Sequence, residues 1–361
     1  MLPEQRTVIP RDALLFVWVT AACTGSPRGE EPDADMDADV DTDVDSDTDS
    51  DSDACEHPAD PVPCERTPRS ETGSLDEEVC IPGGWFRMGT DDPESLLSWR
   101  PRHWVEVSPF FLDHFPVTLE RYGECVDAGA CPVPEPDGVR DPMDCDDPDA
   151  CAKGGAPWWC PRPCGEVDPH SRIDGVAWEA AAAFCSWDER EGVPARLPTE
   201  AEYERAEVGL GCVPRTYPWG EAPPTCERVC MRSAPAECAD DGSDTGTDAC
   251  DPGNYCVVDS RPAGESEDRV AALMGTALVP IADCFVGDFY STGEAQGPDP
   301  LCGPGSALPE CKGCGAAGHV WRGNPSTAIM DCPWQHLLAR RRTSGVSAGP
   351  ATGIRCARDA R

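Results

Sequence analysis

The sequence predicts a fold of short strands and few helices that is held together by disulfide bonds. The 361 residues contain 39 prolines and 34 glycines, which interrupt regular secondary structure often. They also contain 23 cysteines, a density typical of proteins whose thiols are oxidised outside the reducing cytosol. We therefore expect a secreted, disulfide-rich domain with long loops and little regular secondary structure.

The N-terminal residues resemble the signal peptide of a bacterial lipoprotein. Arg6 and Arg11 precede an apolar run over residues 13–22, which has the length of a signal-peptide core and is too short to span a bilayer. Small residues end the run directly before Cys23, as in a lipobox, where the cysteine becomes the lipidated first residue. An ordinary secretory signal with a spare Cys23 is the alternative. Residues 1–22 are predicted to be the signal peptide, and lipidation at Cys23 predicts an outer-membrane or surface lipoprotein of the cell envelope.

Residues 23–54 are predicted to form the lipidated cysteine and a disordered tether. Aspartate occupies every second position from Asp33 to Asp53, and like charges at this spacing repel and extend the chain. A calcium loop needs a glycine turn and a distal glutamate, and this run has neither. The whole chain has a net charge of −38. Because the charge is strongly negative, we expect no nucleic-acid partner and membrane contact through the lipid anchor only.

One segment after residue 100 predicts two strands and a short helix. Apolar residues favour a strand over Trp104–Val107 and, after a bend, a second apolar strand. Thr118 is the N-cap candidate of the helix that follows, because its hydroxyl can accept a hydrogen bond from a free backbone N–H of the first turn.

Two further helices are predicted from periodicity and capping residues. Apolar side chains recur at helical spacing from Val176 onward, and Gly192 is expected to end this helix. Thr199 and Glu202 match a capping box at the start of the next helix, in which each side chain accepts a hydrogen bond from the other residue's backbone. Gly209 is expected to end that helix.

Six sequence blocks occur in an order that is typical of one protein family. They read IPGGWFRMGT (Ile81–Thr90), PRHWVEVSPFFLDHFPVTLERYGECV (Pro101–Val126), GVAWEAAAAFCSWDEREGVPARLPTEAEYERAE (Gly175–Glu207), YPWG (Tyr217–Gly220), VWRG (Val320–Gly323) and TGIRCAR (Thr352–Arg358). Together they resemble the formylglycine-generating enzyme family, also called the sulfatase-modifying factor domain family. The string RLPTEAEYERA in the third block is specific on its own.

The resemblance implies an α+β formylglycine-generating-enzyme fold that is related to the C-type lectin fold. It runs from about Val79 to Arg358, so we expect this domain over residues 79–358 and a cysteine-containing linker over residues 55–78. Sparse secondary structure and many loops agree with the composition described above.

The resemblance also implies a copper-dependent oxidase that converts a sulfatase cysteine to formylglycine with molecular oxygen. Its motif places two copper-binding cysteines with four residues between them, and soft thiolates suit Cu(I). Here Arg322 and Gly323 match the start of the motif, but Ala328 and Pro333 stand where the cysteines would fall. No two cysteines in the chain differ by five positions. Cys332 is the remaining catalytic candidate, and half of a structural disulfide is the other interpretation of it.

Calcium ligands that the resemblance implies are missing as well. The family pattern near the middle of the domain is replaced by GTALVPIAD, residues 275–283, in which Gly275 and Asp283 match but the amide and carboxylate ligands do not occur. The stretch after YPWG offers no asparagine. We therefore expect neither copper nor calcium as a cofactor.

The cysteines are better explained by disulfides. The resemblance implies a bond between Cys185 of the central helix and Cys356 of the terminal block. Cys125 and Cys131 are a local candidate pair because few residues separate them. Cys311-Lys-Gly-Cys314 fits a redox pair or half of a zinc site, and we interpret it as a structural disulfide in a turn.

Three functions stay open at this point. The first is a surface-anchored, non-catalytic binding or scaffold module, a pseudoenzyme whose partner is an envelope protein or a glycan. The second is a formylglycine-generating oxidase in which Cys332 works with a cysteine distant in sequence. The third is iron-dependent chemistry as in the family's sulfoxide synthases, which recruit histidines from an additional helical domain. Framework blocks match and chemical blocks do not, so we expect the first.

Overall fold

The computed structural model describes the chain in segments between residues 60 and 360. The described residues are 60–69, 75–93, 95–133, 169–173, 175–190, 192–223, 225, 227–229, 257–274, 278–314, 318–323, 341–342 (backbone only) and 353–360. All of them belong to a compact unit that spans Asp49–Arg361. The predicted signal peptide, the predicted tether and Cys23 lie outside the described residues.

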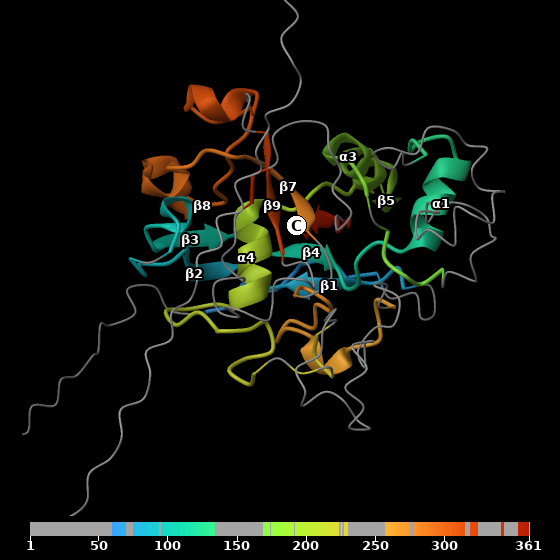
Figure 1. Cartoon of the computed structure of the whole chain (residues 1–361), viewed down its shortest axis with the longest axis horizontal. Helices are drawn as coiled ribbons and strands as arrows, with labels where there is room; N and C mark the ends of the chain where they lie inside the picture. Colours follow the sequence, from blue (N-terminus) through green and yellow to red (C-terminus); the bar gives the residue numbers. More distant parts are fainter. Residues whose placement is uncertain are drawn as a thin grey trace, which may run out of the picture. The chain divides into compact units, whose positions relative to one another are not determined.

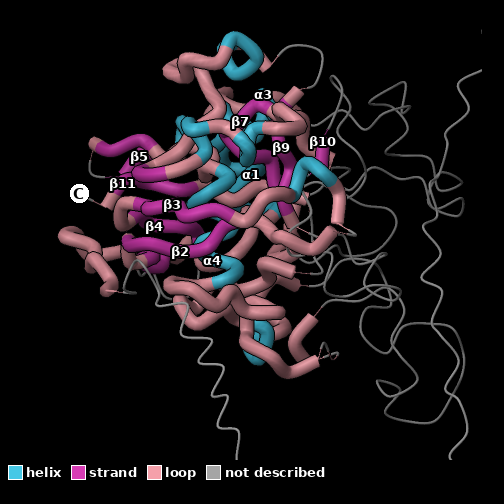
Figure 2. Tube along the Cα trace, turned by 90° about the vertical axis from the view of Figure 1, so that its left-hand side faces the viewer, coloured by secondary structure: helices cyan, strands magenta, loops and turns pink. Residues whose placement is uncertain are grey.

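Helices form a small part of the described chain. The α-helices are α1 (Leu119–Asp127), α3 (Trp178–Trp187) and α4 (Glu200–Val208). Short 3-10 helices are η1 (Leu97–Trp99), η4 (Pro262–Gly264), η5 (Phe289–Ser291), η6 (Gly293–Ala295) and η7 (Pro309–Lys312). Within the described segments, none is long and apolar enough to cross a membrane. Figure 2 shows how much of the chain is loop.

Short strands form several small sheets. The strands are β1 (Glu78–Ile81), β2 (Gly84–Met88), β3 (His103–Val107), β4 (Phe110–Asp113), β5 (Glu189–Arg190), β6 (Val193–Pro194), β7 (Val279–Cys284), β8 (Gly297–Pro298), β9 (His319–Arg322), β10 (Arg341–Arg342) and β11 (Ala357–Asp359). β4 lies between β1 and β11, and β9 lies between β7 and β10, each antiparallel to both neighbours. β3 pairs antiparallel with β2 and parallel with β8, while β5 pairs with β6.

The larger hydrophobic core lies where α4 packs against β2, β3, β7 and β9 (Figure 1). These four strands contribute the fully buried side chains Phe86, Val105, Ile281 and Val320. A second core forms between α1 and α3, where the rings of Tyr122 and Phe184 stack with their centroids 5.7 Å apart. Burial of apolar surface at about 25 cal/mol per Å² is the main stabilising term in both cores.

The structure confirms the predicted caps of α1 and α4. Thr118 Oγ1 accepts a hydrogen bond from Arg121 N at 3.2 Å. Thr199 Oγ1 accepts from Glu202 N at 3.1 Å, and Glu202 Oε2 accepts from Thr199 N at 2.8 Å, which completes the capping box. Gly209 follows the last residue of α4 with a φ of 83°, a left-handed conformation that favours glycine.

Helix α3 ends earlier than the sequence predicts, at Trp187 rather than at Gly192. Asp188 leaves the helix because its carboxylate lies 3.1 Å from Arg121 Nη2 and 3.0 Å from Arg190 Nη2. Gly192, with a φ of 79°, instead lies in the turn between β5 and β6. Ion pairs from outside the helix therefore decide where it stops.

Disulfides link residues that lie between 6 and 171 positions apart in sequence. The bonded pairs with both partners described are Cys64–Cys80, Cys125–Cys131, Cys185–Cys356, Cys284–Cys314 and Cys302–Cys311. Cys185–Cys356 joins α3 to the residue before β11, and Cys125–Cys131 closes the loop after α1, as predicted for both pairs. All eleven cysteines in the described part of the chain are disulfide-bonded.

Candidate functional site

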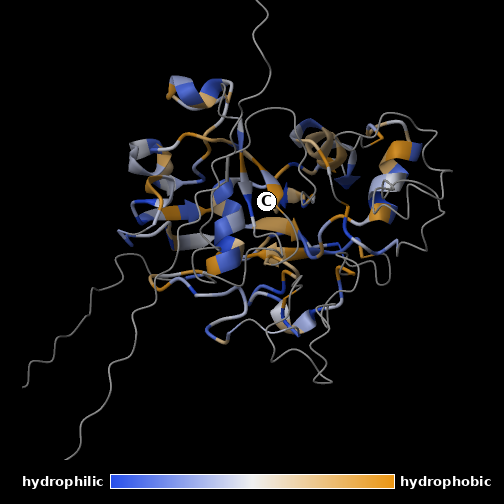
Figure 3. Cartoon of the chain, in the orientation of Figure 1, coloured by the Kyte–Doolittle hydropathy of each residue, from blue (hydrophilic) through white to orange (hydrophobic). Residues whose placement is uncertain are grey.

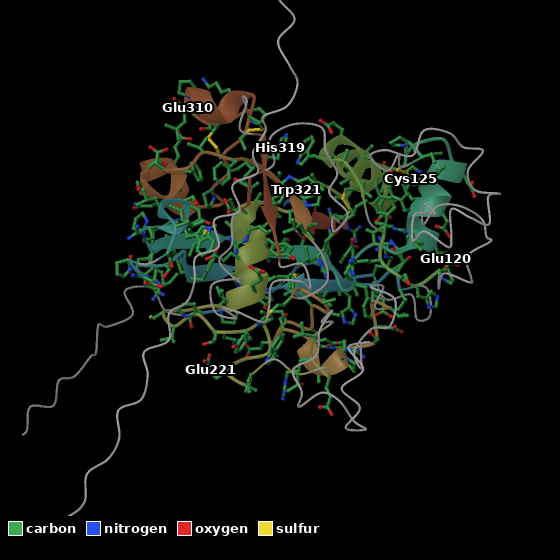
Figure 4. All side chains as sticks on the ribbon, in the orientation of Figure 1. Glu120, Cys125, Glu221, Glu310, His319 and Trp321 are labelled. Atoms are coloured by element: carbon green, nitrogen blue, oxygen red, sulfur yellow. A yellow bond between two sulfur atoms is a disulfide. The ribbon has the colours of Figure 1, made fainter. Side chains whose placement is uncertain are left out.

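Strand β9 carries the matched start of the family's catalytic motif, and it buries Arg322 completely. Figure 4 shows the side chains of His319 and Trp321 on this strand. The Arg322 guanidinium faces α4: Nη1 lies 3.0 Å from Glu204 Oε2, and Nη2 donates to Glu207 Oε2 at 2.7 Å. Glu200 Oε1 lies 3.6 Å from Nη1. The arginine therefore points into the core, where it is surrounded by carboxylates.

The three carboxylates come from one face of α4. Glu200, Glu204 and Glu207 are spaced by four and three residues, which places their side chains in one row of an α-helix. All nine residues of α4 are buried, although the helix is largely hydrophilic (Figure 3). Burying charges costs free energy unless they are paired. Arg322 supplies the opposite charge that lets this helix pack in the core.

Burial changes the protonation of this cluster. Desolvation raises the pKa of Glu207 to about 8, although Arg322 acts in the opposite direction. Oε1 of Glu207 has no hydrogen-bond partner among the described residues, so no donor stabilises the charged form at that oxygen. Burial lowers the pKa of Arg322, but Glu204 and Glu207 more than compensate, so its pKa lies well above the usual value. Glu207 therefore holds a proton at neutral pH.

The carboxylates of Glu204 and Asp283 accept hydrogen bonds from backbone N–H groups. Glu204 Oε1 accepts from Gly89 N at 2.6 Å, just after β2. Asp283 Oδ2 accepts from Glu200 N at 2.7 Å, and its Oδ1 accepts from Cys302 N at 2.8 Å. These bonds tie the first turn of α4 to β7 and to the loop that follows. They are framework contacts.

The described part of the family's calcium block does not fit calcium. Both carboxylate oxygens of Asp283 already accept from backbone N–H groups. Its neighbours Leu278, Val279 and Pro280 carry no side-chain oxygen. Calcium takes six to eight oxygen ligands, so Asp283 here acts as a support for α4 and for the Cys302 loop.

The described residues do not fit a copper centre of the family's kind either. Such a centre needs two free thiolates, and all eleven cysteines in the described segments are oxidised. Cys332, Ala328 and Pro333 lie outside the described residues, so the structure does not place the positions of the copper motif.

The two cysteines of the CKGC turn do not bond to each other, so the expected local disulfide is wrong. Cys311 pairs with Cys302, and Cys314 pairs with Cys284. Cys311 lies within η7 and is completely buried, whereas Cys314 follows that helical turn and is only half-buried. The turn therefore directs the two sulfurs to different partners.

The Cys284–Cys314 disulfide lies beside His319, the first residue of β9. Sγ of Cys314 is 3.3 Å from Nδ1 of His319. The indole of Trp178 stacks on the imidazole with centroids 3.7 Å apart and planes 9° apart. Burial lowers the pKa of His319, although a backbone hydrogen bond at Asp283 acts in the opposite direction. At neutral pH the imidazole is therefore uncharged, and one ring nitrogen keeps a free lone pair.

Sequence reasoning missed both clusters, for different reasons. The row of carboxylates on α4 was readable from spacing alone, but its partner Arg322 lies 115 residues after Glu207. Nothing in the spacing of the cysteines points from Cys314 back to Cys284, 30 residues earlier. The first contact depends on the packing of α4 against β9, and the second depends on the packing of η7 against β7.

Fold and site together define a disulfide-rich protein of mixed helices and strands, in which an internal strand arginine neutralises a buried acidic helix. Residues 64–242 match the model of the sulfatase-modifying factor enzyme 1-like domain. The chain belongs to the formylglycine-generating enzyme family, as the sequence blocks predict. The predicted relation to the C-type lectin fold and the boundaries at residues 79 and 358 stay predictions.

Relatives of this chain carry names of both active and inactive proteins. A formylglycine-generating enzyme of Thermomonospora curvata is 33% identical over 163 residues, which are 39% of this chain and 52% of the relative. An inactive C-alpha-formylglycine-generating enzyme 2 of Mus musculus is 32% identical over 176 residues, 42% of this chain and 54% of the relative. The chain thus spans about half the length of the curated relatives it matches.

A solved structure extends the similarity to most of the chain at the level of the fold. PvdO from Pseudomonas aeruginosa superposes with a TM-score of 0.56 at 20% identity, over 81% of this chain and 98% of its own. The mixed α/β fold with few helices is therefore that of the family.

Proposed function

We propose that this protein is a surface-anchored binding or scaffold module that keeps the family's fold without its oxidase chemistry. One observation carries the proposal: no two cysteines in the whole sequence have four residues between them, that is, differ by five positions. A copper site of the family's kind needs that pair, because a single thiolate does not hold Cu(I) in an open linear site. Replacement by Ala328 and Pro333 removes both sulfurs while the framework blocks remain.

Buried contacts of β9 support the same proposal. Arg322 is matched to the family motif, yet its charge is balanced by the Glu204 carboxylate at 3.0 Å, and it also donates to Glu207 at 2.7 Å. A fully buried arginine in such a cluster stabilises the fold and is not free to meet a substrate. Arg322, a motif residue that this chain retains, therefore stabilises the fold.

The anchoring part of the proposal rests on the N-terminal sequence. An apolar run ending at Cys23 and the aspartate-rich stretch after it suit a lipid anchor and a spacer that holds the domain away from the membrane. Substitution of Cys23→Ser in the expressed chain tests this. We expect the wild type in the membrane fraction and the variant in the soluble fraction; equal membrane recovery of both would contradict the anchor.

The partner that we propose is an envelope protein or a glycan. The net charge of −38 opposes nucleic acids and anionic lipids, which leaves neutral or basic surfaces as partners. A pull-down from the envelope of cells that express the chain, with a Cys23→Ser chain as bait, identifies the partner.

Incubation with a sulfatase-type peptide tests the absence of oxidase activity. The purified chain receives Cu(I), oxygen and a peptide with the sequence C-x-P-x-R, and aldehyde is captured with a hydrazide probe. We expect no aldehyde from the wild type. A formylglycine-generating oxidase is the alternative function, because several relatives are named formylglycine-generating enzymes.

Aldehyde formed by the wild type would overturn the proposal. In that case Cys332→Ala separates the two remaining possibilities: loss of activity would assign the oxidase to Cys332, and unchanged activity would assign it to another thiol of the chain.

A further inference from the structure

We propose that Cys284, Cys314 and His319 form a zinc-binding site when a dithiol opens the Cys284–Cys314 disulfide. The site is separate from the family's copper motif, which falls on residues 322–333. It also goes beyond the scaffold function proposed above, because that function needs no metal.

The ligand atoms are already gathered. The two Sγ atoms and one imidazole nitrogen all lie within 4.8 Å of one another. In a tetrahedral zinc site with Zn–S of about 2.3 Å and Zn–N of about 2.1 Å, sulfur and nitrogen ligands lie roughly 3.6 Å apart. Cys314 Sγ and His319 Nδ1 are 3.3 Å apart, so a small movement brings them to that spacing. Two cysteines and one histidine with an open fourth position are a known zinc ligand set.

The histidine is held in place by its surroundings. Trp178 stacks on the imidazole at 3.7 Å, and the indole Nε1 donates to the carbonyl oxygen of Ile281 at 2.8 Å, which fixes the ring that lies against the histidine. Backbone of Ala282 and Asp283 hydrogen-bonds the imidazole. A metal-binding histidine commonly has one ring nitrogen held by a backbone carbonyl while the other binds the metal.

Backbone elements on either side of the site are fixed independently of the disulfide. Cys284 is the last residue of β7 and pairs with His319, the first residue of β9. Cys284 N donates to the carbonyl oxygen of Cys302 at 2.7 Å. Two ligands therefore keep their positions when the sulfur–sulfur bond opens, and Cys314 has only its loop to adjust.

A thiol in solution can reach the Cys284–Cys314 disulfide from the side of Cys314. Cys314 and His319 are half-buried, whereas Cys284 is 2% exposed. A dithiol first attacks one sulfur and forms a mixed disulfide, then its second thiol displaces the protein sulfur. The products are a cyclic disulfide of the reductant and two protein thiols. Zinc binding then exchanges the two S–H protons for two S–Zn bonds and releases the protons to solvent.

The site is tested by titrating Co²⁺ into the full chain after stepwise reduction of its disulfides. Co²⁺ can replace Zn²⁺, and its bonds to thiolates give a charge-transfer absorption band. Dithiothreitol is added in steps and removed under argon, and alkylation with mass spectrometry identifies the sample in which Cys284 and Cys314 are thiols. We expect one Co²⁺ per chain with a charge-transfer band in that sample and no band in the oxidised chain. Zn²⁺ is expected to abolish the band in a competition titration.

Two variants assign the ligands. His319→Ala keeps every cysteine and is expected to weaken Co²⁺ binding at least 10-fold, in line with the loss of one of three protein ligands. The matched control is Cys64→Ser with Cys80→Ser, which removes another disulfide of half-buried cysteines whose sulfur contacts backbone carbonyls. This control is expected to leave the affinity within about twofold.

Three results would overturn the proposal. They are an absent band after the bond has opened, an equal affinity in His319→Ala, and loss of the near-ultraviolet circular dichroism signal on opening this bond alone. A chain that binds Co²⁺ and yet forms aldehyde on the sulfatase-type peptide would contradict the proposed scaffold function and leave the zinc site standing.

Discussion

Glu207 is a carboxyl group at the end of a buried helix, and its protonation links the charge cluster to pH. Its pKa of about 8 lies above the ordinary value of 4.5 because burial penalises the carboxylate. The folded state therefore holds the proton more tightly than the unfolded chain does. Stability from this group is complete below pH 4.5 and is lost as the pH rises through about 8.

Glu207→Gln is expected to remove this pH dependence. Between pH 6.5 and 9 the wild type should lose about 2 kcal/mol of unfolding free energy, since one pKa unit corresponds to about 1.4 kcal/mol. Urea unfolding at both pH values measures it. The range avoids Asp76, a second buried carboxyl whose pKa is raised to about 6. Glu221→Gln, at an exposed position, serves as the control and should keep the wild-type slope. An identical slope in Glu207→Gln would contradict the assignment.

Single residues show where sequence reasoning succeeded and where it stopped. Thr199 and Glu202 were predictable as a cap because both partners lie within one turn. The role of Asp283 was not predictable from sequence. It matches a position in the family's calcium block, but here its carboxylate accepts hydrogen bonds from two backbone N–H groups. Local hydrogen bonds can be inferred from sequence, whereas a buried ion pair depends on which strands meet.

Among the elements, α4 depends most on its first turn. The capping box of Thr199 and Glu202 provides hydrogen-bond acceptors for two backbone N–H groups. Asp283 accepts from a third, that of Glu200. Loss of such a cap costs on the order of 1 kcal/mol.

Thr199→Ala is therefore expected to lower the unfolding free energy by about 1 kcal/mol. Thr199→Ser keeps the hydroxyl acceptor and should lie within a few tenths of a kcal/mol of the wild type. Chemical denaturation of the three chains measures the difference. Equal losses in both variants would show that the methyl group, rather than the hydrogen bond, carries the effect.

Helix α3 shows how a neighbouring element overrides a sequence pattern. The periodicity favoured continuation to Gly192, but Asp188 is drawn to Arg121 of α1 and to Arg190 of β5. The residues after the helix then pair as a short hairpin. The existence of the helix was predictable from its apolar residues, and its end was not, because the ion pair with Arg121 comes from a distant segment.

At the scale of the molecule, disulfides fix segments that are distant in sequence next to each other. Cys185 and Cys356 are 171 residues apart in sequence, and their bond fixes the terminal block beside α3. This pairing came from the family resemblance, since twenty-three cysteines allow far too many connectivities for spacing to decide. The pairs of Cys284 and Cys302 were unpredictable because they depend on the packing of η7 against β7.

Removal of the Cys185–Cys356 bond by paired Cys→Ala substitutions is expected to cost about 5 kcal/mol, because the bond restricts a long loop in the unfolded chain. The Cys125–Cys131 bond closes a loop of six residues, and its removal should cost about 2 kcal/mol in the same chain-entropy model. Unfolding free energies from denaturant titration compare the two. A larger loss for the short loop would contradict the entropic explanation.

The central claim is that this chain keeps the family's fold without its copper chemistry, and a Cu(I) titration tests it most directly. The purified chain, with its disulfides intact, is titrated against a chromogenic Cu(I) chelator. The variant Ala328→Cys with Pro333→Cys, which places two cysteines with four residues between them, is titrated beside it. We predict that the wild type leaves the copper with the chelator and that the variant takes up one equivalent. Stoichiometric copper uptake by the wild type that disappears in Cys332→Ala would contradict the account.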